Sequence, residues 1–126
     1  MPNALPFDPA DCPIRDVLNR LGDQWSLLVL ETLETRVWRF NELSREIPDI
    51  SRQMLSKTLR RLEEDGFVTR TLYAEVPPRV EYELTALGHS VLVPVQALIG
   101  WADSNHHAIR TARGEFREPI SHPKAE

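Results

Sequence analysis

The side chains with the clearest chemical potential lie between residues 51 and 65, where the spacing of apolar residues predicts a helix. The apolar members of this helix recur every three or four positions; they are Met54, Leu55, Thr58, Leu59 and Leu62. At about 100° per residue, the opposite side carries Gln53, Lys57 and Arg60, with Ser56 and Arg61 at its flanks. Arginine and lysine donate hydrogen bonds to guanine edges and glutamine pairs with adenine, so this face has the chemistry to read bases in a major groove.

The ends of this predicted helix add a second kind of contact. Ser51 is a favourable N-cap, and Gly66 is a favourable C-terminal stop. Ser51 and Arg52 therefore stand at a helix N-terminus, where unpaired backbone N–H groups and the helix dipole attract phosphates. We expect these two residues near the DNA backbone, and Arg61 at the edge of the same interface.

The charge of the chain is distributed unevenly. A net charge of −4 would by itself argue against a nucleic-acid partner. Residues 36–61, however, carry seven basic and three acidic side chains, whereas residues 1–35 carry two and six. A basic segment focuses attraction for phosphates on one face, and for this purpose the local field matters more than the total charge. The alternative is that this segment is only the solvated face of a helix.

The rest of the sequence predicts the elements that position this helix. Periodicity indicates helices at residues 13–21 and at about 23–34, where Asp23 is an N-cap candidate, and a brief helix that Asn41 caps or begins and Pro48 stops. Residues 37–40 form a short strand-like run, and residues 67–73 and 79–84 predict a β-hairpin with residues 75–78 at its tip. Two helices followed by a hairpin is the order of a winged helix-turn-helix. The expected fold class is therefore mainly α with a small β-hairpin (α+β).

Arg79 stands beside the tip of the predicted hairpin, which would form the wing. A wing lies next to the recognition helix, which is here the predicted helix at residues 51–65. Arg79 is therefore a candidate donor to a phosphate or to the minor groove, and Arg70 is a weaker one. The alternative is structural, with Arg79 pairing only with Glu75 or Glu81. The sequence leaves both roles open.

The remaining apolar surface predicts contact between two copies of the chain. Residues 13–21 carry an apolar stripe, and the helical region that Thr85 caps carries a wide one, which Pro94 should kink or divide. One small core cannot cover so much surface, so we expect the flanking N- and C-terminal helices to form a homodimer. The expected interface residues are Ile14, Leu18, Leu87, Val91, Val95, Leu98 and Trp101. The alternative is that the last helix folds back onto its own domain.

The ends of the chain are expected to contribute little to the fold. Residues 1–11 are predicted to be a flexible segment and residues 12–108 a single domain that includes the dimerisation helices. Beyond about Asn105 the sequence is polar and contains Gly114, Pro119 and Pro123. Residues 109–126 are therefore expected to form a mobile tail.

Other classes of function find little support. The sequence has no glycine-rich phosphate loop, CxxC pair or HExxH motif, and the adjacent His106 and His107 point in different directions on a helix. We expect no enzyme, no cofactor and no metal site. The apolar stretches are too short to span a bilayer and no signal peptide is evident, so a cytoplasmic location is expected. A winged fold that binds only another protein is the remaining alternative, although such a partner would not need the basic face.

Several blocks of the sequence together resemble the HxlR-type bacterial regulators. They are residues 12–18 (CPIRDVL), 22–28 (GDQWSLL), 39–43 (RFNEL), Ile50-Ser51, Met54-Leu55, residues 62–66 (LEEDG) and residues 77–85 (PPRVEYELT). The resemblance implies a winged helix-turn-helix homodimer, related in shape to MarR-type regulators, that binds a roughly two-fold symmetric double-stranded DNA operator as repressor or activator. This chain departs from the family pattern at residues 35–38, where a glycine-containing turn is usual.

Cys12 is the one cysteine of the sequence and immediately precedes Pro13 at the start of the first predicted helix. Backbone N–H groups and the helix dipole favour a thiolate there, with Arg15 one turn on, and the thiolate is the reactive form of cysteine. The position matches the N-terminal cysteine of HxlR-type regulators, which in some members responds to oxidants or electrophiles. The resemblance thus implies a sensing role for Cys12 toward an oxidant or small-molecule effector. The alternative is a small buried apolar residue without a signalling role.

Overall fold

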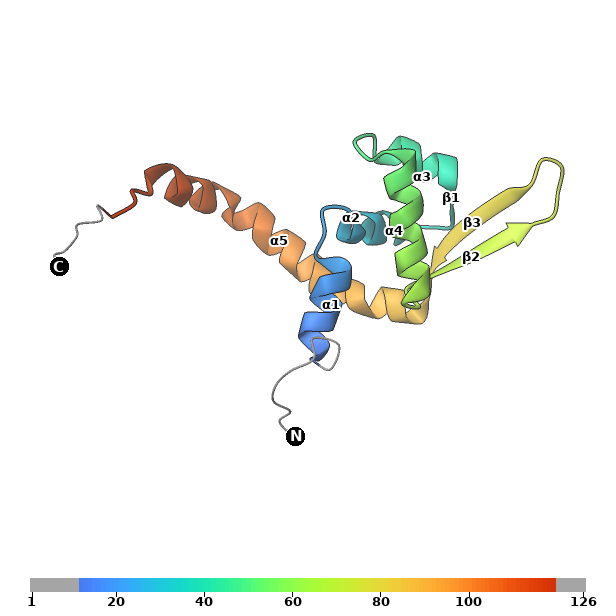
Figure 1. Ribbon diagram of the computed structural model, residues 1–126, viewed down its shortest axis with the longest axis horizontal. Coiled ribbons are helices and arrows are strands. Elements are labelled where there is room, and N and C mark those ends of the chain that lie inside the picture. The colour runs from blue at the N-terminus through green and yellow to red at the C-terminus, as the bar shows by residue number, and fades with distance from the viewer. Residues whose placement is uncertain (1–11, 120–126) are drawn as a thin grey trace. The chain divides into compact units, whose positions relative to one another are not determined.

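The computed structural model describes residues 12–119, and the chain divides into one compact unit up to Val95 and a second from Gln96 onward. The elements in chain order are α1 (Pro13–Leu21), α2 (Ser26–Leu33), β1 (Trp38–Arg39), α3 (Phe40–Glu46), α4 (Arg52–Glu64), β2 (Val68–Tyr73), β3 (Arg79–Leu84) and α5 (Ala86–Glu115) (Figure 1). The expected fold class is confirmed. The predicted flexible segment at residues 1–11 and the last seven residues of the predicted tail lie outside the described residues.

The helices α1 and α2 are both present as predicted, but α2 starts later than expected. Pro13 occupies the first turn of α1, where its missing N–H costs nothing, and Gly22 follows its last residue. The helix α2 begins at Ser26 and not at Asp23, so the predicted start is wrong by three residues. The physical reason is a local turn: the Asp23 carboxylate accepts the Trp25 backbone N–H at 3.1 Å, which holds these residues outside the helix.

The helices α3 and α4 form the helix-turn-helix pair. The helix α3 begins at Phe40, one residue before the predicted Asn41, because the Glu42 carboxylate accepts the Arg39 backbone N–H at 2.9 Å. Ser51 caps α4 as predicted, since its Oγ accepts the Met54 backbone N–H at 3.0 Å. Gly66 follows α4 with φ of 82°, a left-handed conformation that glycine adopts without strain.

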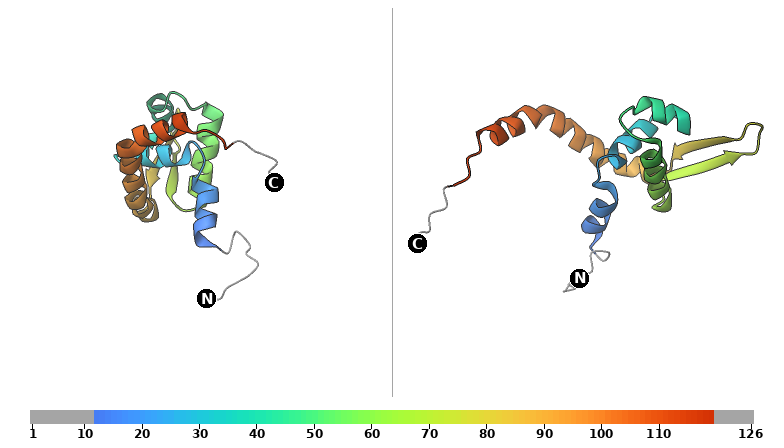
Figure 2. Two further views of the ribbon diagram at one scale, coloured as in Figure 1. Left: turned by 90° about the vertical axis from the view of Figure 1, so that its left-hand side faces the viewer. Right: turned by 45° about the horizontal axis from the view of Figure 1, so that its top comes forward.

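The predicted hairpin is present and gains a third strand. The strands β2 and β3 pair antiparallel from Val68 opposite Leu84 to Tyr73 opposite Arg79. The short run at Trp38–Arg39 joins the open side of β3, so that the sheet order is β1-β3-β2. Beyond this junction the β2–β3 hairpin extends away from α2, α3 and α4, and the right-hand view of Figure 2 shows the same protrusion.

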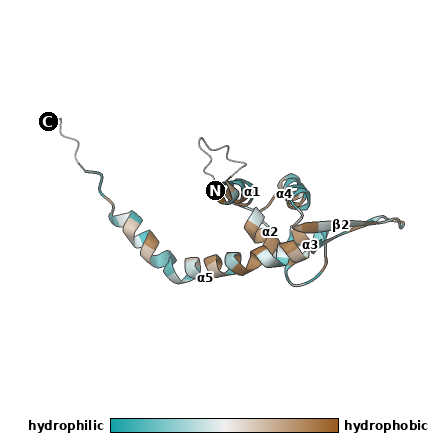
Figure 3. Ribbon diagram, turned by 90° about the horizontal axis from the view of Figure 1, so that it is seen from below, coloured by the Kyte–Doolittle hydropathy of each residue, from teal (hydrophilic) through white to brown (hydrophobic). Residues whose placement is uncertain are grey.

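The core of the first unit is built around α2. Val29, Leu30 and Leu33 are at most 1% exposed, as expected for a central buried helix. The helix α4 contributes its one apolar face, on which Leu55, Thr58, Leu59 and Leu62 are buried. Figure 3 shows the difference in hydropathy, with α2 coloured brown and α4 largely teal. The packing thus fixes α4 by one side and leaves its other side to solvent.

Ion pairs join α1 and its following turn to the C-terminal end of α4. Arg20 Nε donates to Asp65 Oδ2 at 2.7 Å, and Arg20 Nη2 donates to Glu64 Oε1 at 3.1 Å. Arg61 Nη2 lies 3.7 Å from Asp23 Oδ1. The orientation of α1 is therefore coupled to that of α4.

The helix α5 is longer than the sequence indicated. Thr85 caps it as predicted, because its Oγ1 accepts the Gly88 backbone N–H at 3.0 Å. The helix is not divided at Pro94 and continues to Glu115, some ten residues past the expected loss of regular structure near Asn105. Its last turns contain alanine, arginine and isoleucine, which sustain a helix even where the surface is polar.

Candidate nucleic-acid interface

The outward side of α4 presents a row of polar and basic side chains. Gln53, Ser56, Lys57 and Arg60 are all exposed, opposite the buried apolar face of the same helix. The Arg60 side chain is 81% exposed, and its Nε lies 3.8 Å from Glu64 Oε2. Together with Phe40 and Arg52, these four residues line a shallow, open depression. The cationic side chains of Arg52, Lys57 and Arg60 and the amide of Gln53 thus lie on the solvent-facing side of a helix. An α-helix has the right diameter to enter a major groove.

Ser51 and Arg52, the two residues predicted to lie near phosphates at the N-terminus of α4, make different contacts. The Ser51 hydroxyl is engaged in the helix cap, and both Ser51 and Arg52 are exposed. The Arg52 guanidinium lies over the Phe40 ring, with its carbon 4.8 Å from the ring centroid. This cation–π contact directs Arg52 toward α3.

Arg61 lies at the flank of this row, where it has an acidic neighbour. Its side chain is about one-quarter exposed and approaches Asp23, at the turn before α2. The angular position at the flank of the helix was correct, but a carboxylate distant in sequence engages the guanidinium on the inner side. Arg61 therefore pairs with Asp23 and is less exposed than Lys57 and Arg60.

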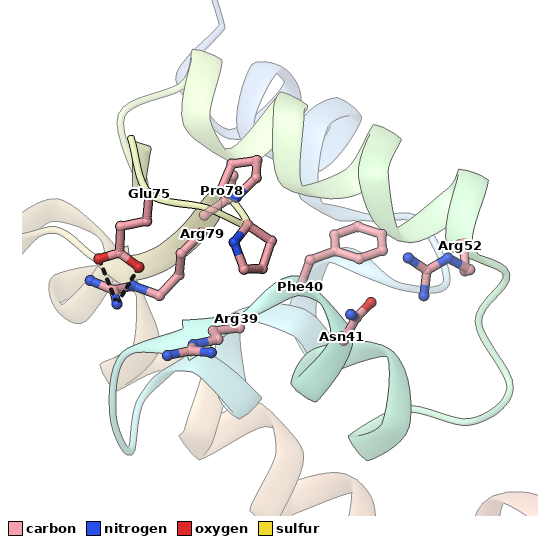
Figure 4. Close-up of a pocket in the computed structure, with 9 residues that line it drawn as sticks. Arg39, Phe40, Asn41, Arg52, Glu75, Pro78 and Arg79 are labelled. Carbon is pink, nitrogen blue, oxygen red and sulfur yellow. Dashed lines mark hydrogen bonds and ion pairs between the residues drawn. The ribbon is translucent and has the colours of Figure 1, made fainter. Parts of the chain in front are cut away.

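A hollow of about 530 Å³ lies between the starts of α3 and α4 and the loop of the hairpin. Its lining includes Arg39, Phe40, Asn41, Arg52, Pro78 and the ion pair of Glu75 with Arg79 (Figure 4). In this view Arg52 stands at one end, Arg79 with Glu75 at the other, and the Phe40 ring between them. Phe40 and Arg52 also line the depression on α4, so the two features adjoin.

The contribution of β1 and α3 to this hollow was missed by sequence reasoning. Arg39 and Asn41 are exposed, and Phe40 is half-buried. The excess of basic residues in residues 36–61 includes Arg39, which was the available signal. Its position depends on the pairing of Arg39 with Glu81 across the β1–β3 ladder, a contact between residues far apart in sequence.

Arg79 forms the ion pairs that the sequence analysis gave as the structural alternative. Its Nη1 lies 3.0 Å from Glu75 Oε2, and its Nε lies 3.1 Å from Glu81 Oε2 without hydrogen-bond geometry. The guanidinium carbon also lies 4.1 Å from the centroid of the Tyr73 ring. Arg70, in contrast, is exposed and lines a smaller hollow of about 290 Å³ with Ser56, Arg60, Glu63 and Tyr82.

The unusual turn at residues 35–38 is held by Arg36. Its guanidinium carbon lies 3.7 Å from the centroid of the Trp38 ring, and its Nη1 donates to Glu42 Oε1 at 3.0 Å. The backbone N–H of Arg39 and the Arg36 guanidinium hold the pKa of Glu42 below its ordinary value. The Trp38 ring is buried against the core, so the guanidinium of Arg36 that stacks on it links this turn to the core.

The residues expected at the contact between two copies of the chain differ in exposure. On α1, Ile14 is 63% exposed, and Leu18 is also exposed. On α5, Leu87, Leu98 and Trp101 are more than half exposed and Val91 is half-buried. Val95 is 7% exposed, buried in the core of its own unit, so it has little surface to offer another copy. Val93, which the sequence reasoning did not include, is 71% exposed.

Two further expectations concern absences within residues 12–119. In this part of the chain, no three histidine, cysteine, aspartate or glutamate residues are grouped so that they could hold a metal ion. None of the helices described there has the length and apolar character needed to cross a membrane.

Comparison with known proteins agrees with this geometry. The sequence model of the HxlR-like helix-turn-helix family matches residues 20–110. The HTH-type transcriptional regulator YtfH of Escherichia coli is 41% identical over 104 residues, which are 82% of each chain.

Solved structures of other regulators share the fold. The transcriptional regulator ytfH from Salmonella typhimurium is 39% identical and superposes with a TM-score of 0.74 over 83% of this chain and 94% of the other. The redox regulator HypR in its reduced form is 35% identical with the same TM-score, 0.74, over 79% and 98% of the two chains. These relatives are transcriptional regulators, a non-enzymatic class of protein, and this chain belongs to the HxlR-like family of helix-turn-helix transcriptional regulators.

Proposed function

We propose that this regulator binds double-stranded DNA sequence-specifically, as a homodimer on a roughly palindromic operator, and controls transcription in the cytoplasm. The observation that carries the proposal is the exposed row of Gln53, Ser56, Lys57 and Arg60 on α4. A helix fixed by one apolar face and free on its polar face suits insertion into a major groove. Arg52 and the N-terminus of α4 are then placed at the phosphates that border the groove.

The proposed homodimer is supported by apolar surface that the chain leaves uncovered. Ile14 and Leu18 on α1, and Leu98 and Trp101 on α5, are all more than half exposed. Side chains of this size normally pack against other side chains, and a second copy of the chain offers the same surface. Two recognition helices would then meet half-sites about 10 base pairs apart.

Selection from a pool of labelled random-sequence duplexes tests this function and returns the operator. We expect enrichment of a motif with two inverted half-sites, bound with an affinity that falls steeply as salt rises. Sedimentation of the free protein at micromolar concentration should give the mass of a dimer. Enrichment of no motif would contradict sequence-specific binding, and a folded monomer that selects one half-site would contradict the dimer.

A sensing role for Cys12 is the finer part of the proposal. Cys12 is half-buried at the N-cap of α1, and HypR, which shares the fold, is named a redox regulator. Oxidation or alkylation of its thiol would change α1 where the two copies are proposed to meet. Operator binding should therefore change after diamide or a quinone in the wild type and not in Cys12→Ser. Equal responses of the two proteins would show that Cys12 senses nothing.

A further inference from the structure

Arg79 is poorly placed to donate to DNA. Its guanidinium lies within 3.0 to 3.2 Å of oxygens from Glu75 and within 3.1 Å of Glu81 Oε2, and it stacks on Tyr73. An arginine with two carboxylates has no net positive charge left to attract a phosphate. The side chain is also only 27% exposed, so its donors are largely turned inward.

The hollow beside Arg79 nevertheless carries a positive charge, which comes from other residues. Arg39 and Arg52 line it from β1 and α4, and both are exposed. Glu75 is the acidic residue of this lining, and Arg79 neutralises it. Without Arg79, the carboxylate of Glu75 would face the two remaining arginines and any phosphate near them.

We infer that this hollow seats a phosphodiester of the operator, that Arg39 and Arg52 bind it, and that Arg79 acts as a positioning residue by offsetting the negative charge of Glu75. This inference rests on the proposed function. With α4 in a major groove and the hairpin beside it, the DNA strand that separates the major from the minor groove must cross between them. The hollow lies between those same elements and adjoins the depression on α4.

The two roles for Arg79 predict different outcomes when its carboxylate partner is removed. If Arg79 donated to DNA directly, neutralising Glu75 could not replace the lost donor. If Arg79 acts by cancelling the charge of Glu75, neutralising Glu75 removes the need for Arg79. Arg79→Met is the suitable variant, because its apolar stem keeps the contact with the Tyr73 ring while the charge is lost.

The test compares Arg79→Met, Glu75→Gln and the double variant by fluorescence anisotropy on the selected operator. Arg79→Met should weaken binding about tenfold, and the double variant should regain most of that loss. Glu75→Gln alone should bind at least as tightly as the wild type. A double variant no tighter than Arg79→Met would overturn the positioning role.

A second measurement tests the phosphate seat itself. Arg39→Ala and Arg52→Ala should each weaken binding to all duplexes alike and lower the slope of log affinity against log salt by about one. Arg113→Ala, which removes the same charge from the last turn of α5 outside the hollow, should leave the slope unchanged. Unchanged slopes for both Arg39→Ala and Arg52→Ala would overturn the seat.

Failure of this inference can be told from failure of the proposed function. If the wild type selects no operator, the proposed function fails and the hollow has no DNA to seat. If the wild type binds its operator and the variants in the hollow bind it equally well, only this inference fails. Thermal unfolding of each variant verifies that the fold is retained, and Arg79→Lys, which keeps the charge, should retain wild-type affinity.

Discussion

Replacing Arg60 by alanine should weaken DNA binding while leaving the stability of the fold nearly unchanged. The Arg60 side chain is 81% exposed, and its nearest carboxylate contact, to Glu64, is 3.8 Å long. A surface pair of this kind contributes about 0.3–0.5 kcal/mol, and alanine recovers part of that through its better helix propensity. We therefore expect the free energy of unfolding to change by less than about 0.5 kcal/mol.

The effect on operator binding should be much larger. An arginine that donates to a base edge contributes about 1–3 kcal/mol, which corresponds to a loss of affinity of about 5- to 160-fold. The loss should be greatest for the operator itself and small for duplexes altered at the base pair that Arg60 reads. A contact to phosphate alone would instead weaken all duplexes equally and reduce the salt dependence.

Anisotropy titrations over a salt series, with the operator and its single-base-pair variants, distinguish these cases. Lys57→Ala is the companion variant on the same face of α4, and urea unfolding monitors the stability of both proteins. Arg113→Ala controls for the loss of one positive charge. If both α4 variants bind the operator as tightly as the wild type, α4 is not the reading element and the reasoning is refuted.

The fold itself allows further predictions. Leu59→Ala should lower the free energy of unfolding by about 2–5 kcal/mol in urea titrations, because Leu59 is 1% exposed in the core; a loss below about 1 kcal/mol would contradict that packing. Trp101→Asp should shift sedimentation toward the monomer and weaken operator binding, since a charge at an apolar interface is unfavourable; a variant that stays dimeric would exclude Trp101 from the interface. The pKa of Glu42 is lower in the folded protein than its ordinary value of 4.5, so its stabilising effect is present above that pH and is lost as the pH falls through the folded pKa. Acid titration of Glu42→Gln should accordingly show a flatter loss of stability below that pH, and a curve parallel to the wild type would disprove the link.

The sequence predicted those features whose causes are local. The helix α4 was expected with its Ser51 cap and its polar face, because periodicity and capping act within a few residues. The hairpin was expected with its tip at residues 75–78 for the same reason. The start of α2 was missed because a side chain, Asp23, competed for the backbone N–H groups that would have begun the helix.

The features that the sequence did not predict depend on contacts between distant residues. The pairing of Trp38 with Tyr82 brings Arg39 beside the hairpin, and no periodicity reports such a pairing. Arg61 occupied its predicted position on the helix, but its partner Asp23 lies in the turn before α2, far away in the sequence. The contacts of Arg79 with Glu75, Glu81 and Tyr73 likewise depend on the positions of these residues in space.

The pairing of Arg20 with Glu64 and Asp65 connects the C-terminal end of α1 to the C-terminal end of α4. The nine residues of α1 span about 13 Å, with Cys12 at the far end from Arg20. A tilt of about 10° at the Cys12 end would displace that end by roughly 2 Å over this length, and the attached end of α4 would turn with it. In the proposed dimer, the angle between the two copies of α1 would therefore set the distance between the two copies of α4.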